Sequence, residues 1–236
     1  MNLPTSWIDL GNPKPRDRVA DFRPIVWPAG VSITLPSASV DVDAQGNGQT
    51  TATFRQVVMR RRSRRTFGAL TRLALSQLLE MTCRTQRVSN LTPDLQLSQR
   101  PVPSGGAIHP IHLLVLEPGA QSVLRYDPMG HALVTVPSKV DPDELRMSIA
   151  EVVDPQQGCV VLLAAEPDRT AAKYESSASV VWRDAGVLIG ALALGAESLG
   201  LAHCPLGITG EPFVSRLVDQ AALVGVGVML LGARTD

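Results

Sequence analysis

Two adjacent glycines lie between prolines immediately before an apolar run, and no other segment constrains this chain as strongly. The segment covers residues 100–110, and the apolar run at 111–116 follows it. Glycine has no Cβ, so its backbone can approach a ligand closely. The prolines stiffen the loop, so its exposed amides need less ordering when a ligand binds. The segment therefore predicts either an ordinary turn before a strand or a ligand-binding loop.

Hydrophobic periodicity predicts helices and strands that alternate along the rest of the chain. Buried strands are expected at 111–116, 159–165 and 224–231, and a hairpin at 123–136. Thr51 is expected to cap a helix that carries Phe54, Val57 and Val58 on one face. Further helices are expected over 73–84, from Asp141, within 171–199 and, briefly, from Glu211. This mixture of sheet and helices indicates an α+β fold.

Composition restricts the classes of function. The chain has 236 residues, of which 44% are hydrophobic and 19% charged, as in a globular protein. Aromatic residues make up only 4%, which argues against a platform for stacking nucleic-acid bases. The formal net charge is zero, so bulk charge favours neither nucleic acid nor an anionic membrane as a partner.

Cysteine usage indicates reduced thiols. Cys83, Cys159 and Cys204 are far apart, and no spacing of Cys and His suits zinc, so we expect buried thiols, no metal and a cytoplasmic protein. The N-terminal residues lack the pattern of a signal peptide. The most apolar stretch, 180–201, contains Arg183, Asp184 and Glu197, and is expected to be a buried helix rather than a membrane span.

Residues 1–50 differ in character from residues 51–236. Prolines interrupt every possible helix there, and 41–49 read as a turn or linker. Residues 31–35 alternate and predict one short strand. We expect an N-terminal extension or arm over 1–50, followed by one domain over 51–236.

Several motifs occur in an order that resembles the nitroreductase-like flavoproteins, and in particular their SagB/ThcOx-type branch of azoline (thiazole- and oxazole-forming) peptide dehydrogenases. The resemblance covers roughly residues 54–232 and implies a mixed or antiparallel central sheet flanked by helices. The matching residues are Arg61, Ser63 and Arg65; Pro103, Ser104, Gly105, Gly106 and Pro110; Tyr126–Pro128; Lys173 and Tyr174; Asp184–Gly186; and 199–207.

The resemblance implies that FMN binds noncovalently. Arg61, Ser63 and Arg65, with Arg62 in the same cluster, would hold its phosphate, which suits the planar fork of arginine. Arg61 and Arg65 share a face if the helix continues through them. The alternative for this cluster is a solvated helix end.

Other segments would contact the ring and the phosphate of FMN. The loop of Pro103, Ser104, Gly105 and Gly106 would lie along the ring, with the Ser104 hydroxyl at the pyrimidine edge. Pro205, Leu206 and Gly207 would pack on the flavin, or else form a helix-to-helix connection. Arg234 would reach the phosphate, or else be solvated.

Lys173 and Tyr174 match the Lys-Tyr pair of the azoline dehydrogenases. Forming an azole from an azoline removes a hydride from one carbon and a proton from its neighbour. The resemblance implies that Lys173 or Tyr174 takes the proton, and the alternative is two surface residues at the start of a helix. The family's glycine after this pair and its histidine after the later Ala-Gly are replaced by Glu175 and Val187, which bears on the substrate more than on the flavin.

The sequence thus predicts an FMN-dependent oxidoreductase acting on a heterocycle in a peptide or thioester-bound intermediate. We expect a homodimer with flavin at the interface, with the apolar helix over 187–199 as a fitting contact. One alternative is an NAD(P)H-dependent reductase of nitro compounds or quinones. The other is a scaffold without catalytic activity that binds flavin or peptide in a biosynthetic complex.

Overall fold

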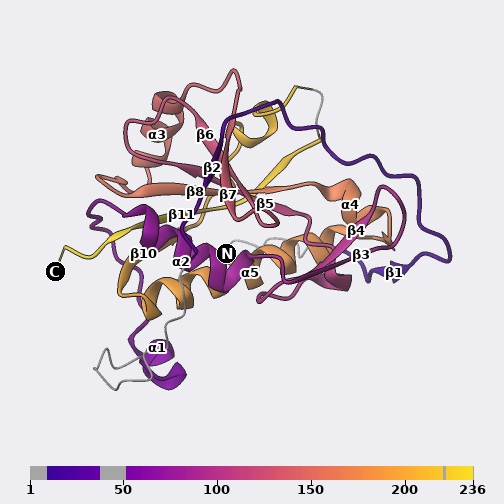
Figure 1. Cartoon of the computed structure of the whole chain (residues 1–236), viewed down its shortest axis with the longest axis horizontal. Coiled ribbons are helices and arrows are strands. Elements are labelled where there is room, and N and C mark those ends of the chain that lie inside the picture. The colour runs from indigo at the N-terminus through magenta and orange to yellow at the C-terminus, as the bar shows by residue number, and fades with distance from the viewer. Residues whose placement is uncertain (1–9, 38–51, 220–221, 236) are drawn as a thin grey trace, which may run out of the picture.

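A seven-stranded antiparallel sheet forms the centre of the molecule (Figure 1). The computed structural model describes residues 10–37, 52–219 and 222–235. Every pair of neighbouring strands in this sheet is antiparallel. Of the two arrangements expected from sequence, mixed or antiparallel, the sheet has the antiparallel one. The strands lie in the order β10 (Leu201–Leu206), β11 (Val224–Ala233), β8 (Cys159–Ala165), β5 (Ile111–Leu116), β6 (Val123–Asp127), β7 (Ala132–Val136) and β2 (Ser32–Thr34).

Helices cover both faces of the sheet, which explains why β5, β8 and β11 read as unbroken apolar runs. Along β8, Val161 and Leu163 pack toward α2 (Arg72–Cys83) and α5 (Ala178–Ser198). Val160 and Leu162 pack on the other face, with α3 (Pro142–Ala150) and the short 3-10 helix η2 (Val214–Arg216). Successive side chains of a strand point to opposite faces, so both sets are buried. The α+β class is confirmed.

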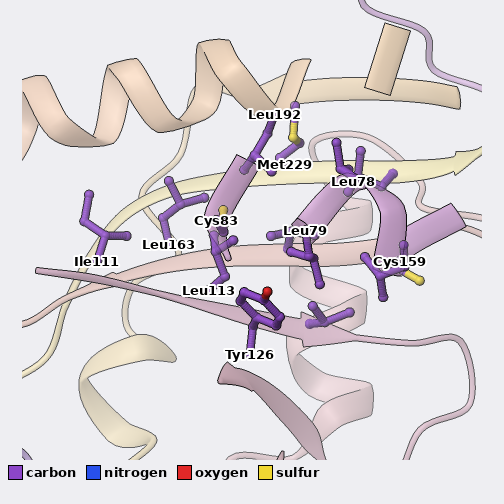
Figure 2. Packing of buried hydrophobic residues seen from close by; sticks show 14 of the residues in the cluster. Leu78, Leu79, Cys83, Ile111, Leu113, Tyr126, Cys159, Leu163, Leu192 and Met229 are labelled. Carbon is purple, nitrogen blue, oxygen red and sulfur yellow. The ribbon is translucent and has the colours of Figure 1, made fainter. Parts of the chain in front are cut away.

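The first core cluster lies between the sheet and α2 with α5. Figure 2 shows Leu79 and Cys83 of α2 near Tyr126, and Leu192 of α5 beside Met229. All three cysteines are free and buried, as expected. Burial raises the pKa of Cys83 to about 11 and that of Cys159 to about 12, so both thiols are protonated at neutral pH.

The first helix, α1 (Phe54–Arg60), begins with a different cap from the one expected. Thr53 is the N-cap: its hydroxyl accepts a hydrogen bond from the Gln56 amide, and the Gln56 side chain accepts one from the Thr53 amide. This reciprocal pair satisfies two amides that the helix leaves free. Thr51 lies outside the described residues.

The N-terminal segment packs across the domain. β1 (Lys14–Pro15) pairs with β9 (Tyr174–Glu175), and β2 forms the edge of the central sheet next to β7. The strand expected at 31–35 is therefore confirmed. In Figure 1 the indigo chain runs from β1 to β2 along the outside of the molecule. The division into an arm and a domain stays a prediction.

Helix α5 is long and apolar enough by composition to span a membrane. In this fold it packs against α2, β10 and β11, and its Asp184 and Glu197 bond to groups of the same chain. One side of α5 is nevertheless exposed, at Trp182 and Val187. The expectation of a buried helix therefore holds for one side of α5 only.

Candidate functional site

The loop with the two glycines is tied to the start of α5. The Ser104 hydroxyl donates to Asp184 Oδ2 (2.6 Å), and the Gly105 amide donates to Asp184 Oδ1 (2.9 Å). The His109 amide in turn donates to Ser104 Oγ (2.9 Å). One turn of 3-10 helix, η1 (Gly105–Ala107), follows Ser104. The Ser104 hydroxyl, which we expected at a flavin ring, is thus engaged by Asp184, and it can reach a ligand only by sharing or breaking that bond.

Both glycines of this loop are required by close contacts. A Cβ on Gly105 would collide with Val180 of α5. Gly106 has a φ of 66°, in the left-handed region, and a Cβ there would lie 2.6 Å from Tyr174 Oη and 2.8 Å from Lys173 Nζ. A side chain at Gly105 would therefore displace Val180, and one at Gly106 would be strained and would displace the ends of Tyr174 and Lys173.

Lys173 and Tyr174 converge on that same loop. Lys173 Nζ donates to the Gly106 carbonyl (3.3 Å) and lies 5.6 Å from the centre of the Tyr174 ring. The two residues follow α4 (Pro167–Ala171) and enter β9, so they do not begin a helix. The amide of Arg16 holds the Lys173 carbonyl (2.9 Å), so the N-terminal segment fixes the backbone here. Two motifs separated in the sequence thus form one cluster.

A pocket of about 190 Å³ opens beside this loop. Pro103, Ser104 and His109 line it from the loop, and Tyr126 and Leu188 from the sheet and α5. Three further lining residues escaped the sequence interpretation, because nothing in their spacing links them: Arg100, Arg125 and Arg169. They come from a loop, a strand and a helix that only the fold brings together.

His109 is held in its neutral form. Desolvation by burial, reinforced by the neighbouring Arg100 charge, lowers the pKa of this imidazole from 6.5 to about 4. The other histidines, His112, His131 and His203, also have pKa values lowered by burial. At neutral pH the pocket therefore contains an uncharged imidazole beside a guanidinium.

This shift predicts a specific loss of stability in acid. Between about pH 6.5 and 4, His109 is protonated in the unfolded chain but neutral in the folded protein. Falling pH therefore lowers the free energy of unfolding in this range. Above about pH 6.5, His109 is neutral in both states and contributes nothing to the pH dependence of stability. Urea unfolding at a series of pH values should show a weaker pH dependence for His109→Gln than for the wild-type protein. Parallel curves for the two proteins would contradict the assignment.

The arginine cluster follows the end of α1 and does not continue its helix. Arg61 is the C-cap, with φ −53° and ψ 122°, so Arg61 and Arg65 do not share a helical face as expected. Arg61, Arg62, Ser63 and Arg65 are exposed, and within the described ranges none of these arginines has a carboxylate partner within 4 Å. The cluster is thus a set of free donors, which suits an anion such as phosphate.

Arg64 and Arg234 are committed to a buried carboxylate. Arg64 Nη1 lies 3.1 Å from Glu197 Oε2, and Arg234 Nη2 lies 2.8 Å from Glu197 Oε1. The Glu197 side chain is only 3% exposed. Arg234 is therefore not simply solvated, because its Nη2 lies against Glu197.

Pro205, Leu206 and Gly207 lie at the end of β10 rather than between two helices, so the alternative of a helix-to-helix connection is wrong. β10 begins beside the arginine cluster, where the Arg64 amide donates to the His203 carbonyl (2.9 Å). Among the described atoms, none lies within 4 Å of where a Gly207 Cβ would be. β10 thus begins near the arginine cluster and ends just before Gly207, where the backbone is not covered by other described residues.

The two groups of candidate residues lie at opposite ends of α5. The loop is bonded to Asp184, whereas the arginine cluster adjoins Glu197. At roughly 1.5 Å and 100° per residue, these two positions are about 20 Å apart along the helix and about 140° apart around it. In Figure 1, α1 lies below one end of α5, while β3 (Arg87–Asn90) and β4 (Gln96–Gln99) lie near the other. The glycine loop and the arginine cluster are therefore attached to well separated positions of α5.

Known structures share this fold. A putative nitroreductase from Ralstonia eutropha JMP134 is 19% identical, with a TM-score of 0.66 over 95% of this chain and 99% of that one. A putative nitroreductase in complex with FMN from Desulfovibrio desulfuricans is 18% identical, with a TM-score of 0.51 over 79% and 89% of the two chains. A chain of the Escherichia coli microcin synthetase McbBCD complex with truncated pro-MccB17 bound is 17% identical, with a TM-score of 0.57 over 76% and 73%.

No curated protein sequence matches the chain. The sequence model of the nitroreductase family, however, matches residues 58–229. That range contains the arginine cluster, the glycine loop, the Lys173–Tyr174 pair and the end of β10. Because the match covers well over half of the chain, this protein belongs to the nitroreductase family.

Proposed function

We propose that this protein is an FMN-dependent dehydrogenase of the SagB type, which converts an azoline to an azole in a peptide or thioester-bound intermediate. The observation that carries the proposal is the convergence of Lys173 and Tyr174 on Gly106. A proton acceptor is needed beside the loop that lines the flavin, and this pair lies there. The similarity to a chain of the microcin synthetase complex supports a peptide substrate.

The residues present fit FMN. Arg61, Arg62 and Arg65, with the Ser63 hydroxyl, offer free donors for a phosphate, and Gly207 leaves backbone open for a flat ring. Pro205 and Leu206 would pack on the ring, and the loop of Pro103 to Gly106 would lie along it. FMN supplies the hydride acceptor when bound. Lys173 or Tyr174 takes the proton from the neighbouring carbon.

The separation of the two groups along α5 supports a homodimer with FMN at its interface. In such a dimer the arginine cluster of one protomer meets the glycine loop of its partner. Apolar side chains are exposed where a partner would pack, at Phe54 and Met59 of α1 and at Trp182 and Val187 of α5. Two exposed glycines of α5, Gly186 and Gly190, would let a second helix approach closely.

A mixing experiment tests both the cofactor and the composite site. The purified protein should be yellow and should release FMN near one per chain on heating. Arg61→Ala/Arg65→Ala disables the phosphate half, and Gly106→Val disables the loop half, so neither variant alone should bind FMN. Unfolding and refolding an equal mixture should restore about a quarter of the sites, because half of the dimers are mixed and each has one intact site.

The outcomes separate the claims. Restoration in the mixture supports both FMN and the composite site. Variants that lose FMN singly without restoration would contradict the shared site, provided that both refold as judged by circular dichroism. A colourless wild-type protein that takes up no added FMN would overturn the flavin proposal and favour a scaffold that binds only peptide.

A reductase of nitro compounds or quinones is the second candidate, because structures described as nitroreductases share the fold. Consumption of NAD(P)H with such an electrophile would favour it. An azoline oxidase would instead pass its electrons to oxygen and need no nicotinamide. A cytoplasmic location stays a prediction.

A further inference from the structure

The pocket beside the glycine loop combines an apolar wall with a cationic one. Val102, Ile111 and Leu188 line one part of it. Arg100, Arg125 and Arg169 line another, whereas the only carboxylate among the described lining residues is Asp184. That carboxylate already accepts the Ser104 hydroxyl and the Gly105 amide. The positive charge of the pocket therefore exceeds its negative charge.

The three arginines differ in how far their charge is balanced. Arg169 lies 3.8 Å from Glu166 and donates to the carbonyls of Ile108 and Gln96. Arg125 stacks over the ring of Trp27 at 5.0 Å and is attracted by the charge of Asp127. Within the part of the chain that the structure describes, Arg100 has no carboxylate within 4 Å. Its Nε donates to the Ser98 hydroxyl (3.1 Å), which is uncharged.

Asp127, the carboxylate whose charge acts on Arg100, also attracts Arg125, so it balances Arg100 only in part. Burial raises the pKa of the Cys83 thiol to about 11 and raises that of the Tyr126 hydroxyl further above neutral pH, so both are uncharged. Burial lowers the pKa of Arg100 itself to about 10, which leaves it protonated at neutral pH. Arg100 is half-buried, and a partly desolvated cation without a paired anion is unfavourable, so a bound anion would relieve that cost.

We propose that this pocket binds a small organic monoanion, a carboxylate on an apolar body, with Arg100 binding the carboxylate. One unbalanced guanidinium calls for one negative charge, and its planar fork matches a carboxylate. The pocket volume of about 190 Å³ limits the ligand to a small molecule or the terminal group of a larger one. The site is distinct from the exposed Arg61–Arg65 cluster at the other end of α5.

If the protein is an azoline dehydrogenase, this pocket would select substrates that carry a carboxylate near the heterocycle. That consequence rests on the proposed function, whereas carboxylate binding does not depend on flavin or turnover. The proposal of carboxylate binding and the proposal of an FMN-dependent dehydrogenase can therefore fail separately. Binding is measured directly, and FMN content is recorded for the same samples.

Isothermal titration near neutral pH tests the proposal with benzoate, benzamide and inorganic phosphate as probes. Benzoate should bind at least 10-fold more tightly than benzamide, its neutral counterpart. Arg100→Gln should weaken benzoate binding roughly 10- to 100-fold, as expected for loss of hydrogen bonds to a charged group. Arg87→Gln, which changes an exposed arginine of β3, should leave it unchanged.

Three results would overturn the proposal. Benzoate binding no tighter than benzamide binding would show that the charge is not recognised, and this comparison needs no variant to fold. Phosphate binding that is tighter than benzoate binding and is lost in Arg100→Gln would identify the pocket as a site for another anion. Benzoate affinity unchanged in a folded Arg100→Gln protein would place the anion elsewhere.

Discussion

Replacing Lys173 with methionine is expected to slow flavin reduction by a thiazoline-containing peptide about 10²- to 10⁴-fold, the usual contribution of a positioned acid or base. Methionine has nearly the length of lysine but no ammonium group. It loses the bond from Nζ to the Gly106 carbonyl and the contact with the Tyr174 ring. The proton of the substrate then has no acceptor from this side chain. The measurement is the loss of oxidised flavin absorbance without oxygen.

Three comparisons make this result specific. Lys139→Met removes an exposed lysine paired with Asp219 and should leave the rate unchanged. FMN content of the Lys173→Met protein should equal that of the wild type, because the phosphate donors lie at the other end of α5. Tyr174→Phe separates the two members of the pair: if tyrosine is the base, this variant loses more activity than Lys173→Met. Full activity in both variants would remove the pair from the mechanism.

The fold was predictable where local pattern and burial agree. β5, β8 and β11 read correctly from sequence, because strands buried on both faces are continuously apolar. The glycine loop was recognisable because glycine is the residue best suited to the left-handed φ of Gly106 and to the close contact of Gly105 with Val180 of α5. The polar hairpin of β3 and β4 was not predicted, because its strands lack the apolar alternation that marks a half-buried sheet.

The site was less predictable, because its contacts join distant segments. The Ser104–Asp184 bond spans 80 residues. Arg100 begins the segment singled out from the sequence, but no pattern links it to Arg125 or Arg169, and only the packing of a loop, a strand and a helix brings the three to one pocket. The sequence likewise showed arginines suited to phosphate without showing that Arg234 is bound to Glu197. Residue type was informative about chemistry, and tertiary packing decided which donors are free.

Replacing Glu197 with glutamine is expected to lower the free energy of unfolding by about 3–5 kcal/mol, the usual cost of breaking a buried ion pair from one side. The Glu197 side chain is 3% exposed and lies between Arg64, which is 12% exposed, and Arg234, which is 29% exposed. Glutamine keeps the shape but removes the charge, so Arg64 and Arg234 lose the one carboxylate that pairs with them among the described residues. Urea unfolding with an unchanged slope would report this as a lower midpoint.

Glu117→Gln is the matched control for Glu197→Gln, because it breaks the pair with Arg72 at 2.7 Å, in which the arginine is 42% exposed. An exposed pair contributes only about 0–1 kcal/mol, and salt screens it more than a buried pair. Equal losses in the two variants would contradict the buried-pair argument. A larger loss for Glu197→Gln means that the ion pair anchors Arg64 to α5 and so positions the neighbouring Arg61, Ser63 and Arg65. FMN affinity should then fall in Glu197→Gln even where the protein remains folded.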